Sequence, residues 1–327
     1  MRSWWLPLIL MTLLVSGAVA AQNRSRVYRV GIIVAGGAGL IPPQIRGLRD
    51  GLGEAGYVEG KDILLDLLQE ENYDQLRANI RNYSQQRIDA IVTTASAETA
   101  IAKDVTDKIP IIFMPAAFPV QLGLVKSMAS PGTNLTGLTL FTDPQEIGKQ
   151  LEVFKETVPP LRRVVVFFDG RKENPVTSMS LAVVRKVAAH LTIKLTEHPV
   201  NALAEAEQAL SSLPKNAGTG VFIICGPMFK ELKKMAVIAI EKKLPLFGCA
   251  ASQVADEGVL LSYIPDLYYM GYRGAWYVDR VLKGAWPQDL PVETPTKFEL
   301  VINRKTAKEI GITISPEMLI LADRVFN

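Results

Sequence analysis

Cysteine and histidine are scarce in this sequence, which holds two of each among 327 residues. The cysteine and histidine spacing of a zinc site is absent, as are a Walker phosphate loop and a Gly-x-Ser-x-Gly elbow. His190 and His198 are expected at the end of a helix and at the end of a strand, away from any cleft. Most of the basis for nucleophilic catalysis assisted by a general base is therefore missing. We expect no enzyme activity, no metal and no cofactor.

An excess of charge of one sign is also lacking. The formal net charge is +3, and lysine and arginine alternate along the chain with aspartate and glutamate. Nucleic acid is therefore not an expected partner. The chain is 48% hydrophobic and 21% charged, which is a globular composition, and its length favours two lobes with sizeable cores.

The two cysteines, Cys225 and Cys249, each follow an apolar run that is typical of a buried strand. If those strands are neighbours, the two thiols lie at the same edge of a sheet and a disulfide can form. The commoner arrangement is two buried free thiols that behave as small apolar residues, and this is the arrangement we expect.

Residues 1–20 have the features of a secretory signal. Arg2 supplies a positive start, residues 4–15 are mostly apolar, and Ala18-Val19-Ala20 matches the small-x-small pattern before a cleavage site. A retained membrane anchor is the alternative, but the apolar run is short for a bilayer span. No cysteine lies near the cleavage point, so a lipid-modified N-terminus is not indicated. We expect cleavage near Ala20 and a soluble mature chain in the periplasm.

Continuous apolar runs, typical of buried strands, alternate along the mature chain with segments whose apolar residues have helical spacing. This alternation is typical of a parallel sheet covered by helices on both faces. Strands are expected at 30–34, 63–68, 90–92 and 109–113, with helices after Pro43 and near Tyr73 and Ala97. The pattern restarts after Thr142, with strands at 164–168, 221–224, 244–247, 259–263 and 298–302, and helices around 147–154, 181–187, 203–210, 268–282 and 304–310. The fold class is therefore α/β, with two doubly wound parallel-sheet lobes.

The passage between these two halves is Pro131-Gly132-Thr133-Asn134 followed by an alternating segment at 135–140. Proline, glycine and the polar pair are typical of a turn, and the alternation is typical of a short strand. Alone, the segment could be an ordinary loop before an edge strand. With a complete strand and helix pattern on each side, we interpret it as the first crossing between lobes.

Ligands of open parallel sheets bind at the carboxyl ends of the strands. The loops at these ends are 35–40, 93–98, 114–120, 169–174, 225–229 and 248–253. Thr94 and Ser96 are the best candidates, because their hydroxyls and the free N–H groups of the next helix can hold a carboxylate, although Ser96 can equally serve as a helix cap. Gly37-Ala38-Gly39 matches only the start of a dinucleotide fingerprint and is interpreted as a flexible cleft loop.

Several motifs resemble those of the ABC transporter substrate-binding family, whose known members include tryptophan- and tyrosine-type receptors. They are Ile109-Pro110-Ile111-Ile112-Phe113, Pro131-Gly132-Thr133-Asn134-Leu135-Thr136-Gly137, Asp256-Glu257-Gly258-Val259-Leu260 and Pro295-Thr296-Lys297-Phe298-Glu299-Leu300-Val301-Ile302-Asn303. The resemblance extends in order over nearly the whole mature chain.

This resemblance implies a periplasmic binding protein of type I, with three crossing segments at 138–142, 260–264 and 290–296. The expected organisation is a signal peptide at 1–20, lobe 1 at 21–140 plus 265–291, and lobe 2 at 141–264 plus 292–327, with helix 268–282 returning to lobe 1. The implied partners are a small-molecule ligand and an ABC permease in the membrane with its ATPase, and we expect a monomer.

The chain departs from the family pattern where the ligand is expected. Phe118 stands where relatives usually have aspartate, and Asp169 where they usually have asparagine. Loss of a carboxylate at Phe118 weakens the expectation that an ammonium group is held there. Phe118, Met228 and Tyr263 would then offer stacking or dispersion contacts.

The expected ligand is an amino-acid-like or aromatic carboxylate. Asp169 and Asp266 are expected near the cleft, where an ion pair or a ligand contact is favoured over an acid–base pair. The full set of expected ligand-binding residues is Ala35, Gly36, Gly37, Thr94, Ala95, Ser96, Pro115, Ala116, Phe118, Asp169, Cys225, Gly226, Met228, Ala250, Ser252, Tyr263 and Asp266.

The leading hypothesis is an extracytoplasmic receptor that feeds an ABC importer. The alternatives are a sensor module that reports ligand to a membrane signalling partner, and a secreted hydrolase or transferase on a similar scaffold. The enzyme alternative lacks a nucleophile and base pair in the sequence.

Overall fold

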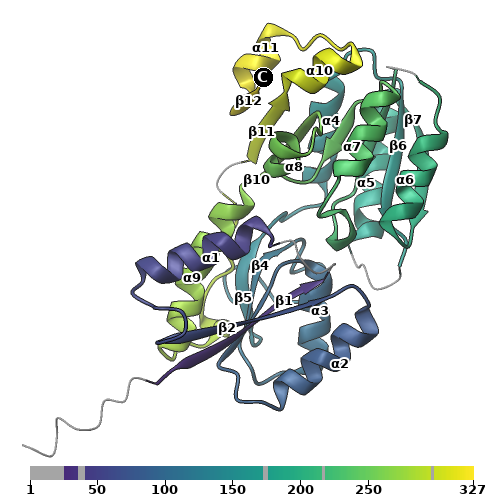
Figure 1. The fold of residues 1–327 in the computed structure, drawn as a ribbon. Helices are drawn as coiled ribbons and strands as arrows, with labels where there is room; N and C mark the ends of the chain where they lie inside the picture. Colours follow the sequence, from purple (N-terminus) through teal and green to yellow (C-terminus); the bar gives the residue numbers. More distant parts are fainter. Residues whose placement is uncertain (1–25, 36–40, 172–175, 216–217, 296–297) are drawn as a thin grey trace, which may run out of the picture.

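The computed structural model describes residues 26–35, 41–171, 176–215, 218–295 and 298–327, which form two α/β lobes (Figure 1). The predicted signal peptide lies outside the described residues. Within the described part, no helix combines the length and the apolar character needed to cross a membrane.

Lobe 1 is built on a five-stranded sheet with the order β2-β1-β3-β4-β5, and every neighbouring pair of strands is parallel. Its elements in chain order are β1 (Tyr28–Ala35), α1 (Pro43–Glu54), β2 (Ile63–Glu70), α2 (Tyr73–Ser84), β3 (Ala90–Thr93), α3 (Ser96–Val105), β4 (Ile111–Ala116) and β5 (Leu135–Thr139). The three strands β3, β4 and β5 are buried along their whole length, which explains the largely apolar sequences of β3 and β4, whereas β5 is buried although its sequence alternates.

Lobe 2 is built on a seven-stranded sheet with the order β12-β11-β10-β9-β8-β6-β7. Its elements are α4 (Gln145–Thr157), β6 (Arg163–Asp169), α5 (Thr177–His190), β7 (Lys194–Val200), α6 (Leu203–Ser212), β8 (Thr219–Ile223), the 3₁₀ turn η1 (Pro227–Phe229), α7 (Lys233–Glu241), β9 (Leu246–Gly248), α8 (Ala251–Asp256), β10 (Leu261–Pro265), β11 (Phe298–Asn303), α10 (Arg304–Ile310), α11 (Pro316–Leu321) and β12 (Arg324–Phe326). β11 runs antiparallel to β10 and parallel to β12, so this sheet is mixed at one end. The C-terminal segment therefore adds β11 and β12 to the sheet of lobe 2.

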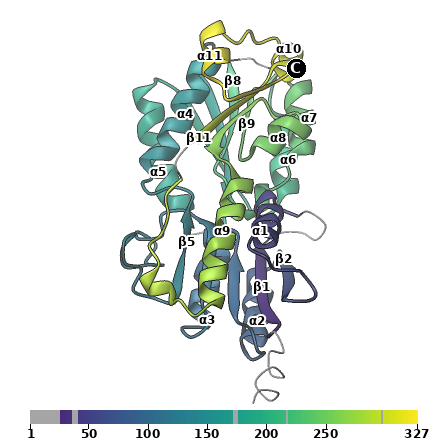
Figure 2. The ribbon, with the colours of Figure 1, turned by 90° about the vertical axis from the view of Figure 1, so that its left-hand side faces the viewer.

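Helix α9 (Leu267–Leu282) leaves lobe 2 and packs against α1 in lobe 1, and Figure 2 shows the two helices side by side. Glycines allow this close approach. A Cβ atom on Gly47 would lie 2.0 Å from the Tyr268 carbonyl oxygen, and one on Gly271 would lie 1.8 Å from the Gln44 carbonyl oxygen. Any larger residue at either position would force the helices apart.

After α9 and the 3₁₀ turn η2 (Pro287–Asp289), the chain stays with lobe 1 as far as Glu293. The Val292 N–H donates to the Met128 carbonyl at 2.7 Å, and the Glu293 N–H donates to the Gly137 carbonyl at 2.9 Å. The passage to lobe 2 thus begins two residues beyond the predicted boundary at 291.

Four aromatic rings join the crossing segments on the hinge side, and we call Phe118, Phe141, Phe298 and Tyr263 the aromatic column. Phe118 stacks on Phe141 with ring centroids 6.0 Å apart, and Phe141 stacks on Phe298 at 5.8 Å. Tyr263 lies against Phe298 at 5.4 Å. Phe118 follows β4 of lobe 1, whereas the other three lie on the crossings and on strands of lobe 2. The column therefore packs part of lobe 1 into the hydrophobic core of lobe 2.

Gly137 in β5 provides a test of the first crossing. Its φ is +144°, and an added Cβ would lie 2.1 Å from the Phe113 carbonyl oxygen in the neighbouring strand. Backbone strain and the clash together should make Gly137→Ala less stable than the wild type by at least about 2 kcal/mol in the free energy of unfolding, measured by urea denaturation.

Gly53→Ala is the matched control, because Gly53 lies in α1 with nothing within 4 Å of an added Cβ. Alanine favours the helix there, so this variant should be as stable as the wild type or more stable by about 0.5–1 kcal/mol. Equal stability of Gly137→Ala and Gly53→Ala would contradict the close packing of β5 on β4.

Candidate functional site

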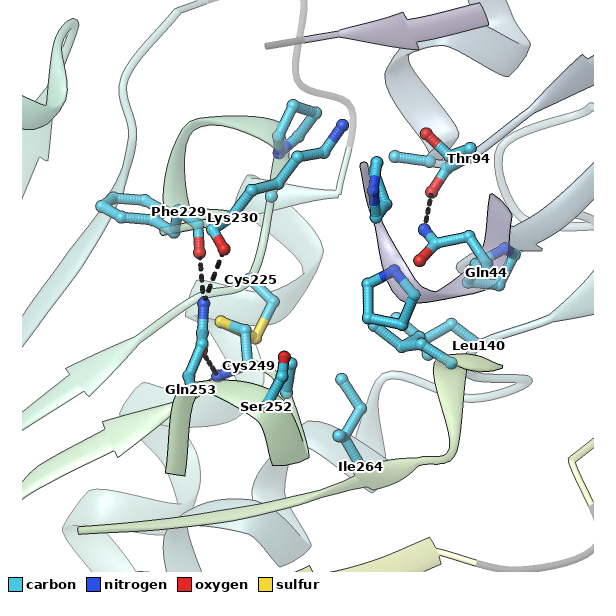
Figure 3. A pocket seen from close by; sticks show the side chains of 18 of the residues that line it. Gln44, Thr94, Leu140, Cys225, Phe229, Lys230, Cys249, Ser252, Gln253 and Ile264 are labelled. Carbon is cyan, nitrogen blue, oxygen red and sulfur yellow. Dashed lines mark hydrogen bonds between the residues drawn. A yellow bond between two sulfur atoms is a disulfide. The ribbon is translucent and has the colours of Figure 1, made fainter. Parts of the chain in front are cut away.

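A cavity of about 450 Å³ lies between the lobes, within the size range of small-molecule sites. Figure 3 shows Gln44 and Thr94 of lobe 1 on one side, and Cys225, Cys249 and Ser252 of lobe 2 on the other. Leu140 and Ile264, from the first two crossings, lie on the hinge side. The lining includes the apolar residues Ile41, Pro42, Pro43, Pro115, Leu140, Phe141, Ile147, Val176, Ile224, Pro227, Phe229, Ile264 and Leu267.

The lobe 1 wall contains the start of α3. The N-cap residue of this helix is Ala95, whose methyl side chain cannot accept a hydrogen bond. The N–H groups of the first turn therefore lack a side-chain acceptor at the cap position. Ser96 does not act as a cap: its hydroxyl oxygen accepts a hydrogen bond from the Ala117 N–H at 2.8 Å. Of the two roles considered for Ser96, helix capping is the one that the geometry does not support.

Behind this wall lies a buried carboxylate, Glu98. One carboxylate oxygen accepts hydrogen bonds from the Thr94 hydroxyl at 2.9 Å and from the Ala35 N–H at 3.1 Å. The second oxygen has no partner among the described residues. The Glu98 side chain is fully buried, so its charge depends on a nearby cation.

That cation comes from the opposite lobe. The Lys230 ammonium donates to the Ala35 carbonyl oxygen at 2.5 Å and lies 4.0 Å from the nearer Glu98 oxygen. Burial lowers the pKa of Lys230 from its usual value, and the Glu98 charge opposes this shift. These contacts connect the lobes across the cleft, and we call them the Lys230 clasp.

A second contact between the lobes involves Arg171 of lobe 2. Its guanidinium pairs with Asp169 at 2.7 Å, donates to the Glu71 carbonyl oxygen at 3.1 Å, and lies 4.4 Å from the centre of the Tyr73 ring. Glu71 and Tyr73 belong to lobe 1. Asp169 therefore orients the arginine that reaches across the cleft.

The lobe 2 wall contains a disulfide between Cys225 and Cys249, with Cα atoms 5.5 Å apart. The expectation of two free thiols was wrong. The cysteines follow β8 and β9, which are adjacent in the sheet, so both side chains reach the same edge. Sequence alone could not decide the pairing, because it depends on strand order.

Gln253 supports the same wall from behind. Its side-chain oxygen accepts from the Cys249 N–H at 2.7 Å, and its amide nitrogen donates to the Phe229 carbonyl at 2.8 Å. Because Lys230 directly follows Phe229, Gln253 and the disulfide together position the segment that carries the clasp. Ser252 lines the cavity beside them.

Eight of the predicted site residues line the cavity, namely Thr94, Ala95, Ser96, Pro115, Cys225, Gly226, Ala250 and Ser252. Seven others lie outside its lining, namely Ala35, Ala116, Phe118, Asp169, Met228, Tyr263 and Asp266. Gly36 and Gly37 lie outside the described residues. The strand ends in the sequence thus located both walls, but not every side chain that faces the cavity.

The seven residues outside the lining have other contacts. The Phe118 side chain is fully buried and stacks in the aromatic column, because a φ of +51° turns the chain there. Asp266 caps α9 by accepting from the Tyr268 and Tyr269 N–H groups. Asp169 pairs with Arg171, so neither carboxylate is placed for an acid–base pair in the cavity.

Sequence reasoning missed Gln44, Ser180 and Lys230, all of which line the cavity. Gln44 follows Pro42-Pro43 at the start of α1, a polar residue in the first turn of a helix that begins at a cleft edge. That position was a usable signal. The sequence contained no such signal for Ser180 and Lys230, because each reaches the cavity only through the turn of a helix or loop.

Neither histidine lines the cavity: His190 is exposed at the end of α5, and the His198 ring packs on Phe167 at 5.4 Å. Within the described ranges, no cluster of three or more histidine, cysteine, aspartate or glutamate side chains is arranged to hold a metal ion.

Comparisons with known proteins agree with this architecture. A family model for ABC transporter substrate binding proteins matches residues 31–326. The tyrosine-binding protein of Clostridioides difficile strain R20291 is 25% identical over 268 residues, which cover 82% of this chain and 76% of that protein.

Two solved structures have a similar fold. A conserved domain protein from Vibrio cholerae O1 biovar El Tor is 28% identical, with a TM-score of 0.81, and the match covers 92% of this chain and 100% of that one. The ABC domain from Streptococcus pneumoniae in complex with L-Trp is 21% identical with a TM-score of 0.79, over 92% of this chain and 100% of that one. The fold is therefore of the periplasmic binding protein type I kind.

The disulfide should contribute substantially to stability, because 24 positions separate the two cysteines. Constraint of a loop of this length in the unfolded chain predicts a loss of about 3 kcal/mol in the free energy of unfolding for Cys225→Ser with Cys249→Ser, measured by chemical denaturation. A reducing agent should destabilise the wild type by a similar amount and leave the double variant unchanged. Equal stability of the oxidised and reduced wild type would contradict this.

Removal of the clasp should separate the lobes. Lys230→Met leaves Glu98 buried without its cation whenever the lobes close, so the ligand-free protein should have a larger radius of gyration in small-angle X-ray scattering. Lys234→Met is the matched control, since Lys234 is exposed on α7. Identical scattering from both variants and the wild type would rule out a role for the clasp in closure.

Proposed function

Because the chain belongs to the ABC transporter substrate-binding protein family, we propose that it is the extracytoplasmic receptor of an ABC importer. The observation that carries the proposal is the cavity lined by both lobes and by the crossings between them. A receptor of this kind binds a small molecule and delivers it to a permease, so it needs an enclosed site and a hinge rather than a reactive group.

Closure follows from the placement of the contacts. A ligand in this cavity touches Thr94 and Gln44 on lobe 1 and Ser252 on lobe 2 at the same time. It therefore binds the closed form more tightly than the open form, and the difference in affinity shifts the population toward closure. The crossing segments absorb the rotation, as in other hinged two-lobed receptors.

The proposed ligand is a small organic carboxylate, amino-acid-like or aromatic. The uncapped start of α3 supports it, since the free N–H groups and the positive end of the helix dipole favour an anion. The predominantly apolar lining suits an apolar remainder. Two similar proteins carry names that point to aromatic amino acids, tyrosine in one and L-Trp in the other.

We further propose that residues 1–20 direct export, that cleavage occurs near Ala20, and that the mature chain acts in the periplasm as a monomer. The disulfide supports an oxidising compartment, because such bonds are rare in the cytosol. The partners are an ABC permease and its ATPase.

The test begins with the chain from Ala21 onward, exported so that the disulfide forms. Mass spectrometry of small molecules released on denaturation should identify a co-purified carboxylate. That compound should raise the melting temperature of ligand-free protein and reduce its radius of gyration, because it stabilises the closed form. Turnover of a substrate without any ligand-dependent closure would overturn the proposal.

A pair of variants locates the binding site. Ala95→Trp places a large ring in the cavity and should abolish the ligand-induced rise in melting temperature. Ala204→Trp, at an exposed position on α6 outside the cavity lining, should leave that rise unchanged. An equal response of the two variants would place the ligand elsewhere.

A further inference from the structure

The cavity contains a buried hydrogen-bond acceptor without a partner. Gln44 is 3% exposed, and its amide nitrogen donates to the Thr94 carbonyl oxygen at 3.4 Å. This bond fixes the orientation of the amide, because a reversed amide would set two oxygens against each other. The Gln44 side-chain oxygen then points away from Thr94 (Figure 3) and has no hydrogen-bond partner among the described residues.

The Gln44 side chain lies beside the proposed anion position, because its amide nitrogen contacts the Thr94 carbonyl oxygen. Gln44 contacts the backbone of Thr94, and Ala95 and Ser96 follow directly at the uncapped start of α3. A ligand carboxylate at the first turn of α3 therefore brings its neighbouring carbon atom near Gln44. An acceptor at that place needs a donor from the ligand, because a buried oxygen left without a partner is destabilising.

The donor can be a neutral hydroxyl or a charged ammonium, and the surrounding charges distinguish them. The carboxylates that line the described cavity are Glu231, Asp256 and Glu257. The first two are exposed, and the third accepts a hydrogen bond from the Leu232 N–H, so none of the three is a buried carboxylate without a partner. A single amide oxygen does not compensate for the desolvation of an ammonium ion.

Two further groups bear on this choice. Lys230 places a cation across the cleft, and the buried Glu98 carboxylate 4.0 Å from it offsets that charge, so this pair leaves no uncompensated negative charge to hold an ammonium. Ser180 lines the same cavity, is fully buried, and has a hydroxyl oxygen without a partner among the described residues. A hydroxyl can both donate and accept, so Ser180 can pair with a further polar atom of the ligand.

We propose that this cavity selects a carboxylate with a neutral hydrogen-bond donor beside it, a 2-hydroxy acid being the simplest form, in preference to the corresponding 2-amino acid. The proposal rests on the proposed receptor function and names the ligand class for that site. The carboxylate meets the first turn of α3, the hydroxyl donates to Gln44, and the remainder of the ligand lies against Pro42, Leu140 and Ile264.

Matched sets of ligands test the selection by isothermal titration calorimetry on the oxidised mature chain. One set is L-tyrosine, 3-(4-hydroxyphenyl)lactate and 3-(4-hydroxyphenyl)propanoate, and another is L-leucine, 2-hydroxy-4-methylpentanoate and 4-methylpentanoate. In the set whose side chain fits the apolar part of the cavity, the 2-hydroxy acid should bind at least about tenfold more tightly than both the amino acid and the unsubstituted acid. Tighter binding of the amino acid would overturn the inference.

Variants assign the preference to Gln44. Gln44→Met keeps the length of the side chain and removes the acceptor, so the hydroxy acid and the unsubstituted acid should bind within about twofold of each other. Gln44→Glu adds a carboxylate and should move the preference toward the amino acid. The control is Gln121→Met, since Gln121 is exposed and likewise donates to a backbone carbonyl, that of Thr142. A preference retained in Gln44→Met would refute the assignment.

Failure of this inference can be told apart from failure of the receptor function. If a co-purified compound closes the lobes while the hydroxy acids do not bind, the selection is wrong and the receptor function stands. If no compound reduces the radius of gyration, both are wrong.

Discussion

The arrangement of the lobes depends on the aromatic column at the hinge. Phe118 belongs to a loop of lobe 1, yet its ring is buried in the core of lobe 2 against Phe141 of the first crossing. Phe298 and Tyr263 extend the contact to the other crossing strands. Motion about the hinge must therefore keep these rings in contact or repack them together, because exposing rings of this size to water is costly.

The cleft side has the opposite character. There the lobes meet through long charged side chains, Lys230 and Arg171, which reach backbone carbonyl oxygens and a tyrosine ring. The groups in these contacts are polar and can be hydrated when the lobes part, unlike the apolar rings at the hinge. The lobes thus meet through apolar packing at the hinge and through polar contacts across the cleft.

Much of this organisation could be predicted from the sequence, and the exceptions have physical causes. Continuous apolar runs identified the buried strands, and strand ends identified both cavity walls through Thr94 and Cys225. The position of Phe118 was not predictable, because a positive φ at a non-glycine residue reverses the direction of its side chain. The disulfide depended on strand order, and the antiparallel β11 on long-range pairing. Both are set by contacts that local patterns do not encode.

Helix α9 has a consequence for how the protein forms in time. The face of the lobe 1 sheet that carries Val30, Ile32 and Met114 is covered by α1 and α9, and α9 is translated only after most of lobe 2. Until α9 has been synthesised, lobe 1 lacks part of its core. On the proposed export route, a lobe that cannot complete its core until late in synthesis would stay unfolded long enough to pass through a translocon that requires unfolded polypeptide.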